Sequence, residues 1–181
     1  NYISEDIDFY NTNDNLKLSG TLMSPKSEYA KIVIILPGSG KDTRNSHYKL
    51  TEEFLKSNIA VYRFDERGVG KSQGKFTTAI NGLTYDLAFA IKHLKSISNF
   101  KDKQIGVVGH SLGGMASIVT NQIINHQKDQ IDFLIQIASP VKSFSDASRY
   151  QIQTLPNYQV KNKSKKELVQ LLDTLVYITD F

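Results

Sequence analysis

Short apolar runs alternate with amphipathic stretches along most of the chain. The apolar runs predict strands, and those at 32–36 and 133–137 have the composition of strands buried on both faces of a sheet. The predicted strands of this kind are residues 32–36, 59–64, 104–108 and 133–137. Apolar residues recur at helical spacing within 48–56, 83–97 and 115–123. Strands that alternate with helices in this way predict an α/β fold, with a mostly parallel sheet covered by helices on both faces.

The two ends of the chain have different patterns. Residues 6–10 and 16–23 alternate apolar and polar positions, and Asn13-Asp14-Asn15 between them is typical of a turn. We therefore expect an antiparallel hairpin with one solvated face at the N-terminus. From Ser145 onward the pattern is helical and more polar.

The first candidate for chemistry is the segment Gly109-His110-Ser111-Leu112-Gly113-Gly114, which directly follows the predicted strand 104–108 and precedes a helical pattern. A Gly-x-Ser-x-Gly sequence between a strand and a helix is typical of a nucleophile elbow. Such a turn strains the backbone of the serine, and Gly109 and Gly113 must lack Cβ so that strand and helix can approach closely. The hydroxyl of Ser111 is then exposed at the positive end of a helix dipole, which makes Ser111 the candidate nucleophile.

A second candidate loop, Pro37-Gly38-Ser39-Gly40, follows the predicted strand 32–36. Ligands of such sheets bind beyond the carboxyl ends of the strands, where both loops would lie. Acyl transfer needs two N–H donors aimed at the developing oxyanion. We assign these donors to the backbone N–H groups of Leu112 and Ser39, with Gly40 as the alternate for Ser39. The competing interpretation is a plain strand-to-helix turn.

A third loop, residues 65–74, is rich in glycine and directly follows the predicted strand 59–64. Asp65 and Arg67 are spaced to brace it through charge-assisted hydrogen bonds. We expect a structural loop that borders the site, with direct substrate contact as the alternative.

A general base for Ser111 is not evident. The histidines are His47, His93, His110 and His126, and none of them follows a late strand. We expect His110 to point away from the nucleophile and to pack locally. Among the four histidines, His47 is the least unlikely general base, because its loop borders the site. Asp146, after the last predicted strand, is a weak candidate for a triad acid.

Composition narrows the possible partners. The chain has no cysteine, which excludes disulfides, thiolate chemistry and Cys-based zinc sites, and we expect no metal and no cofactor. The net charge of +4 is spread along the chain, so we expect no nucleic-acid partner.

A single cluster of basic residues predicts a solvated helix start or an anionic partner surface. It consists of Lys161, Lys163, Lys165 and Lys166. No stretch reaches the ~18 apolar residues of a transmembrane helix, and no signal-peptide pattern is present.

Several of these motifs together resemble the amino-terminal part of an α/β-hydrolase, close to the esterase-like bacterial hydrolases with a helical cap. Residues 18–22 followed by Pro25 resemble the second-strand segment, and residues 62–72 resemble the loop after the fourth strand. Residues 36–40, with Asp42 and Arg44, resemble the oxyanion loop. Two departures from the family pattern are Pro37-Gly38, where His-Gly is usual, and Leu112, where many esterases of this subgroup have glutamate. The likeness covers roughly residues 6 to 155.

The resemblance implies a serine hydrolase, most simply a carboxylesterase that cleaves small-molecule acyl esters through an acyl-enzyme on Ser111. The family order is serine, then an acid after a seventh strand, then a histidine after an eighth. Six strands are predicted here, so we expect an α/β-hydrolase fold that lacks its last strands, with the acid and the histidine beyond Phe181. The predicted domains are 1–144, the N-terminal portion of the hydrolase domain, and 145–181, the start of a helical cap or insertion. We expect this chain to be inactive alone and to have an open sheet edge.

Two other classes compete with this interpretation. A P-loop nucleotide kinase is suggested by Gly38-Ser39-Gly40-Lys41 after a buried strand, but Ile35 and Asp42 occupy positions where the phosphate-loop pattern needs Gly and Ser or Thr. Gly70-Lys71-Ser72 is a second near match. The third possibility is a non-catalytic remnant or an interaction protein built on the hydrolase fold.

Overall fold

A computed structural model describes residues 2–124, 129–140, 144–154 and 163–179. The chain forms two compact units, Asn1–Ser139 and Pro140–Phe181. The strands are β1 (Tyr2–Asp6), β2 (Phe9–Asn11), β3 (Leu16–Leu18), β4 (Gly20–Pro25), β5 (Lys31–Leu36), β6 (Ala60–Phe64), β7 (Gln104–His110) and β8 (Phe133–Ile137). The helices are α1 (Tyr48–Lys56), α2 (Ile80–Ser96), α3 (Leu112–Ile124), α4 (Phe144–Thr154) and α5 (Lys165–Thr179).

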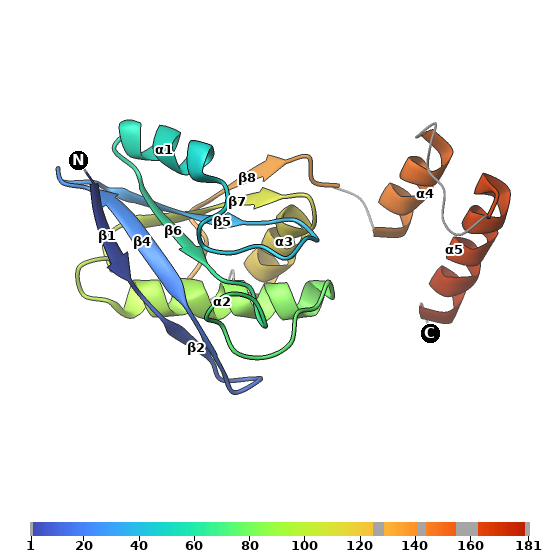
Figure 1. Ribbon diagram of the computed structural model, residues 1–181, viewed down its shortest axis with the longest axis horizontal. Coiled ribbons are helices and arrows are strands. Elements are labelled where there is room, and N and C mark those ends of the chain that lie inside the picture. The colour runs from blue at the N-terminus through green and yellow to red at the C-terminus, as the bar shows by residue number, and fades with distance from the viewer. Residues whose placement is uncertain (1, 125–128, 141–143, 155–162, 180–181) are drawn as a thin grey trace. The chain divides into compact units, whose positions relative to one another are not determined.

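The first unit is built on a six-stranded sheet with the order β1-β4-β6-β5-β7-β8 (Figure 1). Strands β6, β5, β7 and β8 run parallel to one another, whereas β4 pairs with both β1 and β6 in the antiparallel sense. Helix α1 covers one face of the sheet, and α2 and α3 cover the other (Figure 1). This arrangement confirms the predicted α/β class with a mostly parallel sheet.

The alternation of side chains along β5 explains why its sequence is apolar throughout. Ile32 and Leu36 point into the core beneath α2 and α3, whereas Val33 and Ile35 point into the smaller core beneath α1. A strand with a helix layer on each face has no solvated side, so the period-two pattern of a half-exposed strand disappears. The same reasoning applies to β6, every residue of which is buried.

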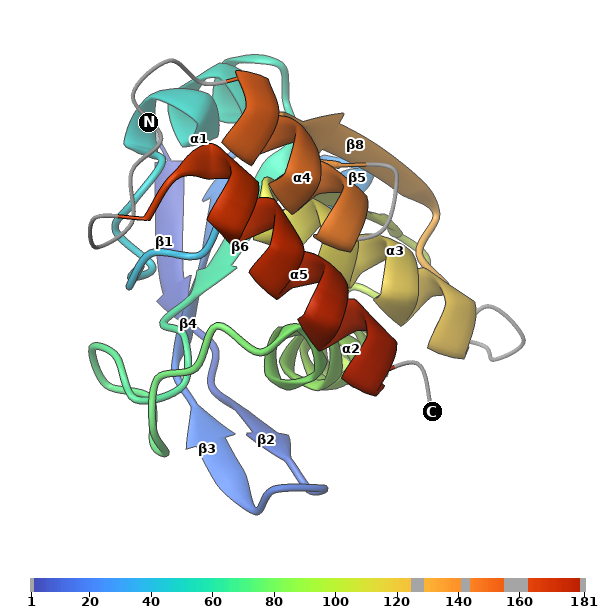
Figure 2. The ribbon, with the colours of Figure 1, turned by 90° about the vertical axis from the view of Figure 1, so that its right-hand side faces the viewer.

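The N-terminal hairpin is present, but its strands pair differently from a single long ladder. Strand β2 pairs with β3 in a separate two-stranded sheet, which lies beside α2 (Figure 2), while β1 pairs with β4 in the main sheet. The two ladders separate at Gly20, where an added Cβ would lie 2.1 Å from the Tyr62 hydroxyl. That hydroxyl donates a buried hydrogen bond of 2.8 Å to the Ile7 carbonyl. Glycine at position 20 thus makes room for the side chain that holds this crossing in place.

Strand β8 differs from its prediction as a buried strand. It pairs with β7 at the edge of the sheet, and Ile135 and Ile137 are each 39% exposed. The apolar run correctly predicted a strand of the parallel sheet, but burial depends on a neighbour on each side. In the described part of the chain, only β7 pairs with β8.

The second unit contains α4 and α5, which contact each other. Arg149 on α4 forms an ion pair with Asp173 on α5 at 2.5 Å. Helix α5 begins with a capping box, in which the Ser164 N–H donates to the Glu167 carboxylate and the Glu167 N–H donates to the Ser164 hydroxyl. The predicted lysine cluster therefore coincides with a helix start, although Lys161 lies outside the described residues. None of the helices in the described ranges is long and apolar enough to cross a membrane.

Candidate active site

Ser111 is the single residue between β7 and α3, and its backbone is in the left-handed region with φ of 52°. The Ser111 N–H donates to the Ile137 carbonyl at 3.0 Å, and its carbonyl accepts the Gly114 N–H at 3.0 Å. A non-glycine residue adopts this conformation only where its surroundings hold it, and strained residues of this kind cluster at functional sites. Ser111 is half-buried.

The glycines on either side of Ser111 are required by close backbone contacts. A Cβ on Gly109 would lie 2.4 Å from the Gly114 Cα, so this glycine lets strand and helix approach as predicted. A Cβ on Gly113 would lie 2.2 Å from the Pro37 carbonyl oxygen. Gly113 therefore makes room for the loop after β5 rather than for β7 itself, which links the two predicted parts of the site.

The loop after β5 reaches Ser111 because of the register between β5 and β7. Leu36 pairs with Gly109, so both strands end at the same level of the sheet. An ideal Cβ on Gly38 would lie 3.4 Å from the Ser111 Cβ. Among the described residues, neither the Leu112 N–H nor the Ser39 N–H donates a hydrogen bond. The loop with Ser39 and the turn with Leu112 thus lie together, and their role as oxyanion donors remains a prediction.

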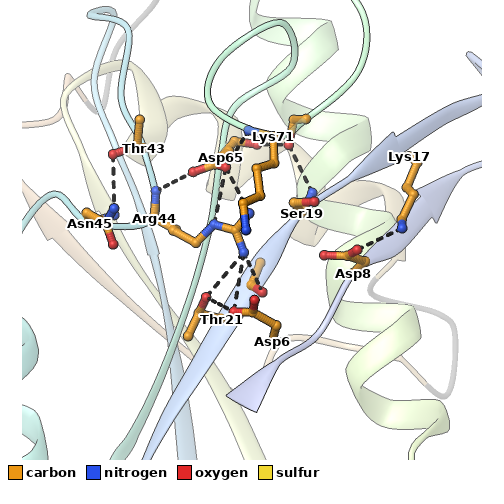
Figure 3. A network of polar contacts seen from close by, with 12 residues as sticks. Asp6, Asp8, Lys17, Ser19, Thr21, Thr43, Arg44, Asn45, Asp65 and Lys71 are labelled. Carbon is orange, nitrogen blue, oxygen red and sulfur yellow. Dashed lines mark hydrogen bonds and ion pairs between the residues drawn. The ribbon is translucent and has the colours of Figure 1, made fainter. Parts of the chain in front are cut away.

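A buried ion pair ties the loop after β5 to the loop after β6 (Figure 3). Asp65 accepts hydrogen bonds from the Arg44 backbone N–H at 2.8 Å, from the Arg44 guanidinium at 3.0 and 3.2 Å, and from the Lys71 N–H at 2.8 Å. Burial alone would raise the pKa of Asp65, but these hydrogen bonds and the Arg44 charge hold it below its usual value. The Arg44 guanidinium also donates to the Gly20 carbonyl at 3.1 Å.

The predicted bracing by Asp65 and Arg67 is present, but each residue uses a partner that the local sequence did not indicate. Arg67 forms a two-pronged pair with Asp86 on α2, with both contacts at 2.8 Å. Asp86 also accepts a hydrogen bond of 2.7 Å from the Asn11 side-chain amide. A further contact of 2.8 Å joins Arg67 to Asp14. These bonds fasten the loop 65–74 to α2 and to the N-terminal hairpin.

A chain of polar groups beside the oxyanion loop was missed from the sequence. The Glu66 carboxylate accepts the Asp42 N–H at 2.7 Å, and the Asp42 carboxylate lies 3.1 Å from the His47 Nε2. The His47 ring lies edge-on to the His110 ring, with centroids 6.2 Å apart. Burial of Glu66, assisted by the nearby charges of Asp42 and Asp86, raises its pKa to about 7. Its position directly after Asp65 is the only local signal that could have indicated this role.

The other candidate residues take positions outside this arrangement. His93 lies within α2. His110 ends β7 and is exposed, with its ring beside Gly38 and His47. His126 lies outside the described residues. Asp146 is in the first turn of α4, in the second unit. In the described part of the chain, no three histidine, aspartate or glutamate side chains are grouped as a metal site would require.

The fold and the Ser111 turn define the class of this protein as a hydrolase of the α/β type. The chain belongs to the family described as serine aminopeptidase, S33 (Hydrolase_4), whose model matches residues 27–172. This membership overturns the kinase alternative. The structure agrees, because α1 begins only at Tyr48, so the segment with Lys41 does not run into a helix N-terminus as a phosphate loop does.

Similar proteins agree with the family assignment. The chain resembles the Pyrococcus furiosus esterase Pf2001, with 27% identity and a TM-score of 0.69 over 96% of this chain and 63% of that chain. It also resembles the α/β hydrolase GrgF from Penicillium, at 20% identity and a TM-score of 0.65 over 96% of this chain and 67% of that one, which supports the fold alone. The uncharacterized protein YfhR of Salmonella typhi is 27% identical over 90 residues, which are 50% of this chain and 30% of that protein.

Proposed function

We propose that this protein is a serine hydrolase that cleaves acyl esters through an acyl-enzyme on Ser111. The observation that carries the proposal is the strained Ser111 turn, against which the loop after β5 is packed. The N–H groups of Leu112 and Ser39, which have no acceptor among the described residues, belong to these two segments. This combination supplies a nucleophile and a candidate oxyanion hole in one place.

In this proposal the Ser111 Oγ attacks the ester carbonyl carbon, and the two N–H groups stabilise the oxyanion that forms. Collapse of the tetrahedral intermediate breaks the bond to the leaving alcohol and leaves the acyl group on Ser111. A general base takes the Ser111 proton and passes it to the alcohol oxygen, and water then releases the acid by the reverse steps. The chain spans 63% of the Pf2001 chain. We place the base and its acid outside the present sequence, so this chain alone has little activity.

The choice of an ester over a peptide rests on the similarity to Pf2001, which is named as an esterase. The family description names an aminopeptidase instead. The two activities are separated by comparing p-nitrophenyl acyl esters with aminoacyl p-nitroanilides on the full-length protein. Ester turnover without anilide turnover is expected, and preferential anilide turnover would assign the protein to the peptidases.

The nucleophile is tested by labelling the full-length protein with a fluorophosphonate probe, which reacts with activated serines. Labelling should be lost in Ser111→Ala, and equal labelling of both proteins would refute the proposal. Ser39→Ala should label normally because only the backbone of Ser39 is used. Ser39→Pro removes that N–H and should slow ester turnover by about a hundredfold or more.

The same assay distinguishes the remaining alternatives. His47→Ala should label like the wild-type protein if the base lies outside this chain, whereas lost labelling would make the His47–Asp42 pair the base. A full-length protein in which Ser111 does not react at all would support a non-catalytic member of the fold.

A further inference from the structure

A polar cavity of about 410 Å³ lies in the first unit, beside the oxyanion loop. Its floor is formed by β4 and β6, where Thr21 and Arg63 are paired across the ladder. Thr43 and Asn45 from the loop after β5 and Lys71 from the loop after β6 also line it. Arg63 is two residues after Val61, which packs beneath α1, so the cavity is on the α1 face of the sheet.

Arg63 is the unusual group in this cavity. Arg63 is only 7% exposed, yet among the described residues its guanidinium has no carboxylate partner. Its guanidinium donates to the Ser46 carbonyl at 2.6 Å and to the weak acceptor Met23 Sδ at 3.2 Å, and the Nε has no partner. A buried cation without a counter-ion is unfavourable. Consistent with this, burial lowers the pKa of Arg63.

The neighbouring arginines show how unusual this is. Arg44 is paired with Asp65 at 3.0 Å, and Arg67 is paired with Asp86 at 2.8 Å. Both of these guanidinium groups therefore have a carboxylate partner within the first unit. Arg63 lines the same open cavity as Arg44 but has no carboxylate partner among the described residues, which is the arrangement of a site that takes its anion from solution.

The charges that line the cavity indicate the valence of that anion. Asp65 and Arg44 neutralise each other, and Asp6, whose side chain is 66% exposed, lies 3.5 Å from the same Arg44 guanidinium. Arg63 and Lys71 are the other charged groups. With all five ionised, three positive charges face two negative ones, a net charge of +1. A singly charged anion matches this lining, whereas a doubly charged one would be opposed by Asp6.

We propose that this cavity binds a small carboxylate, with Arg63 as its main ligand and Lys71 as the second cation. The planar guanidinium fork suits a carboxylate, and the Thr43 hydroxyl and the Asn45 amide supply further polar groups in the cavity. Thr43 and Asn45 belong to the loop that also contains Ser39, so the bound anion contacts the oxyanion loop away from Ser111. This site is separate from the proposed hydrolase chemistry and does not depend on it.

The test measures the binding of acetate and benzoate to the wild-type protein by calorimetry and by thermal unfolding, with sodium chloride at equal ionic strength as the reference. Either carboxylate should raise the unfolding temperature above the chloride reference. Arg63→Met should weaken binding by about tenfold or more, and Lys71→Met should weaken it by a smaller factor. Lys49→Met, an exposed lysine on α1, is the matched control and should bind like the wild type.

Three outcomes would overturn the proposal. Carboxylates could stabilise the protein no more than chloride does, or Arg63→Met and Lys71→Met could bind as well as Lys49→Met. Inorganic phosphate at a pH where it is doubly charged could bind more tightly than acetate, which would refute the valence argument. If Arg63→Met does not fold, Lys71→Met and Asn45→Ala decide the result, because both residues lie at the rim of the cavity.

Discussion

Replacing Glu66 by glutamine should change how the stability of this protein depends on pH. Glu66 is 5% exposed, and its Oε2 accepts the Asp42 N–H at 2.7 Å. Glutamine has nearly the same shape and keeps an oxygen for that hydrogen bond, but it cannot ionise. The substitution therefore removes the charge of residue 66 while retaining its contact with the oxyanion loop.

The sign of the effect follows from the raised pKa of Glu66, which moves from 4.5 to about 7 in the folded protein, chiefly through burial. Below pH 4.5 both the folded and the unfolded chains hold the proton, and ionisation costs nothing. Between these two values the unfolded chain has lost the proton that the folded chain keeps, so stability falls as pH rises. Above about pH 7 the penalty is complete. One pKa unit corresponds to about 1.4 kcal/mol. The shift from 4.5 to about 7 therefore lowers the free energy of unfolding by about 3 kcal/mol in total.

The assay is urea unfolding of the wild-type protein and of Glu66→Gln across this pH range. The variant should gain up to about 3 kcal/mol relative to the wild type between pH 4.5 and 8, with the difference levelling off above pH 7. The surface control is Glu52→Gln on α1, whose side chain is 55% exposed, and its effect should stay below about 0.5 kcal/mol. A difference that does not change with pH, or a variant that becomes relatively less stable as pH rises, would refute the reasoning.

Two further predictions concern close contacts. Gly113→Ala places a Cβ 2.2 Å from the Pro37 carbonyl oxygen, so it should destabilise the first unit by about 3 kcal/mol and slow the labelling of Ser111. Gly40→Ala is the control, because an added Cβ there meets open space, and it should have neither effect. Asp86→Asn should cost about 3 kcal/mol in denaturant unfolding because it leaves a buried guanidinium underpaired, whereas Asp14→Asn, at the exposed end of the same network, should cost less than about 1 kcal/mol. Equal effects within either pair would contradict these contacts.

The strands and helices followed closely from local patterns. Strand β5 was predictable because a strand covered on both faces is apolar at every position, and α2 because its apolar residues recur at helical spacing. The exposure of β8 was not predictable, since its apolar run is equally compatible with a central strand and with an edge strand. Burial of a strand depends on which neighbours pair with it, and this is a property of the whole sheet.

For the candidate site, the sequence alone indicated the Gly-x-Ser-x-Gly turn, because the motif is local, whereas the contact with the Pro37 carbonyl that requires Gly113 depends on the pairing of β5 with β7. The ion pairs that hold the surrounding loops were decided only by the tertiary structure. Arg44 and Asp65 are 21 positions apart, and Arg67 and Asp14 are 53 apart. Any aspartate could have been the partner of either arginine until the sheet brought the strand ends together. Burial likewise decided which groups have shifted pKa values, because desolvation of a carboxylate depends on the atoms packed around it and not on its neighbours in the chain.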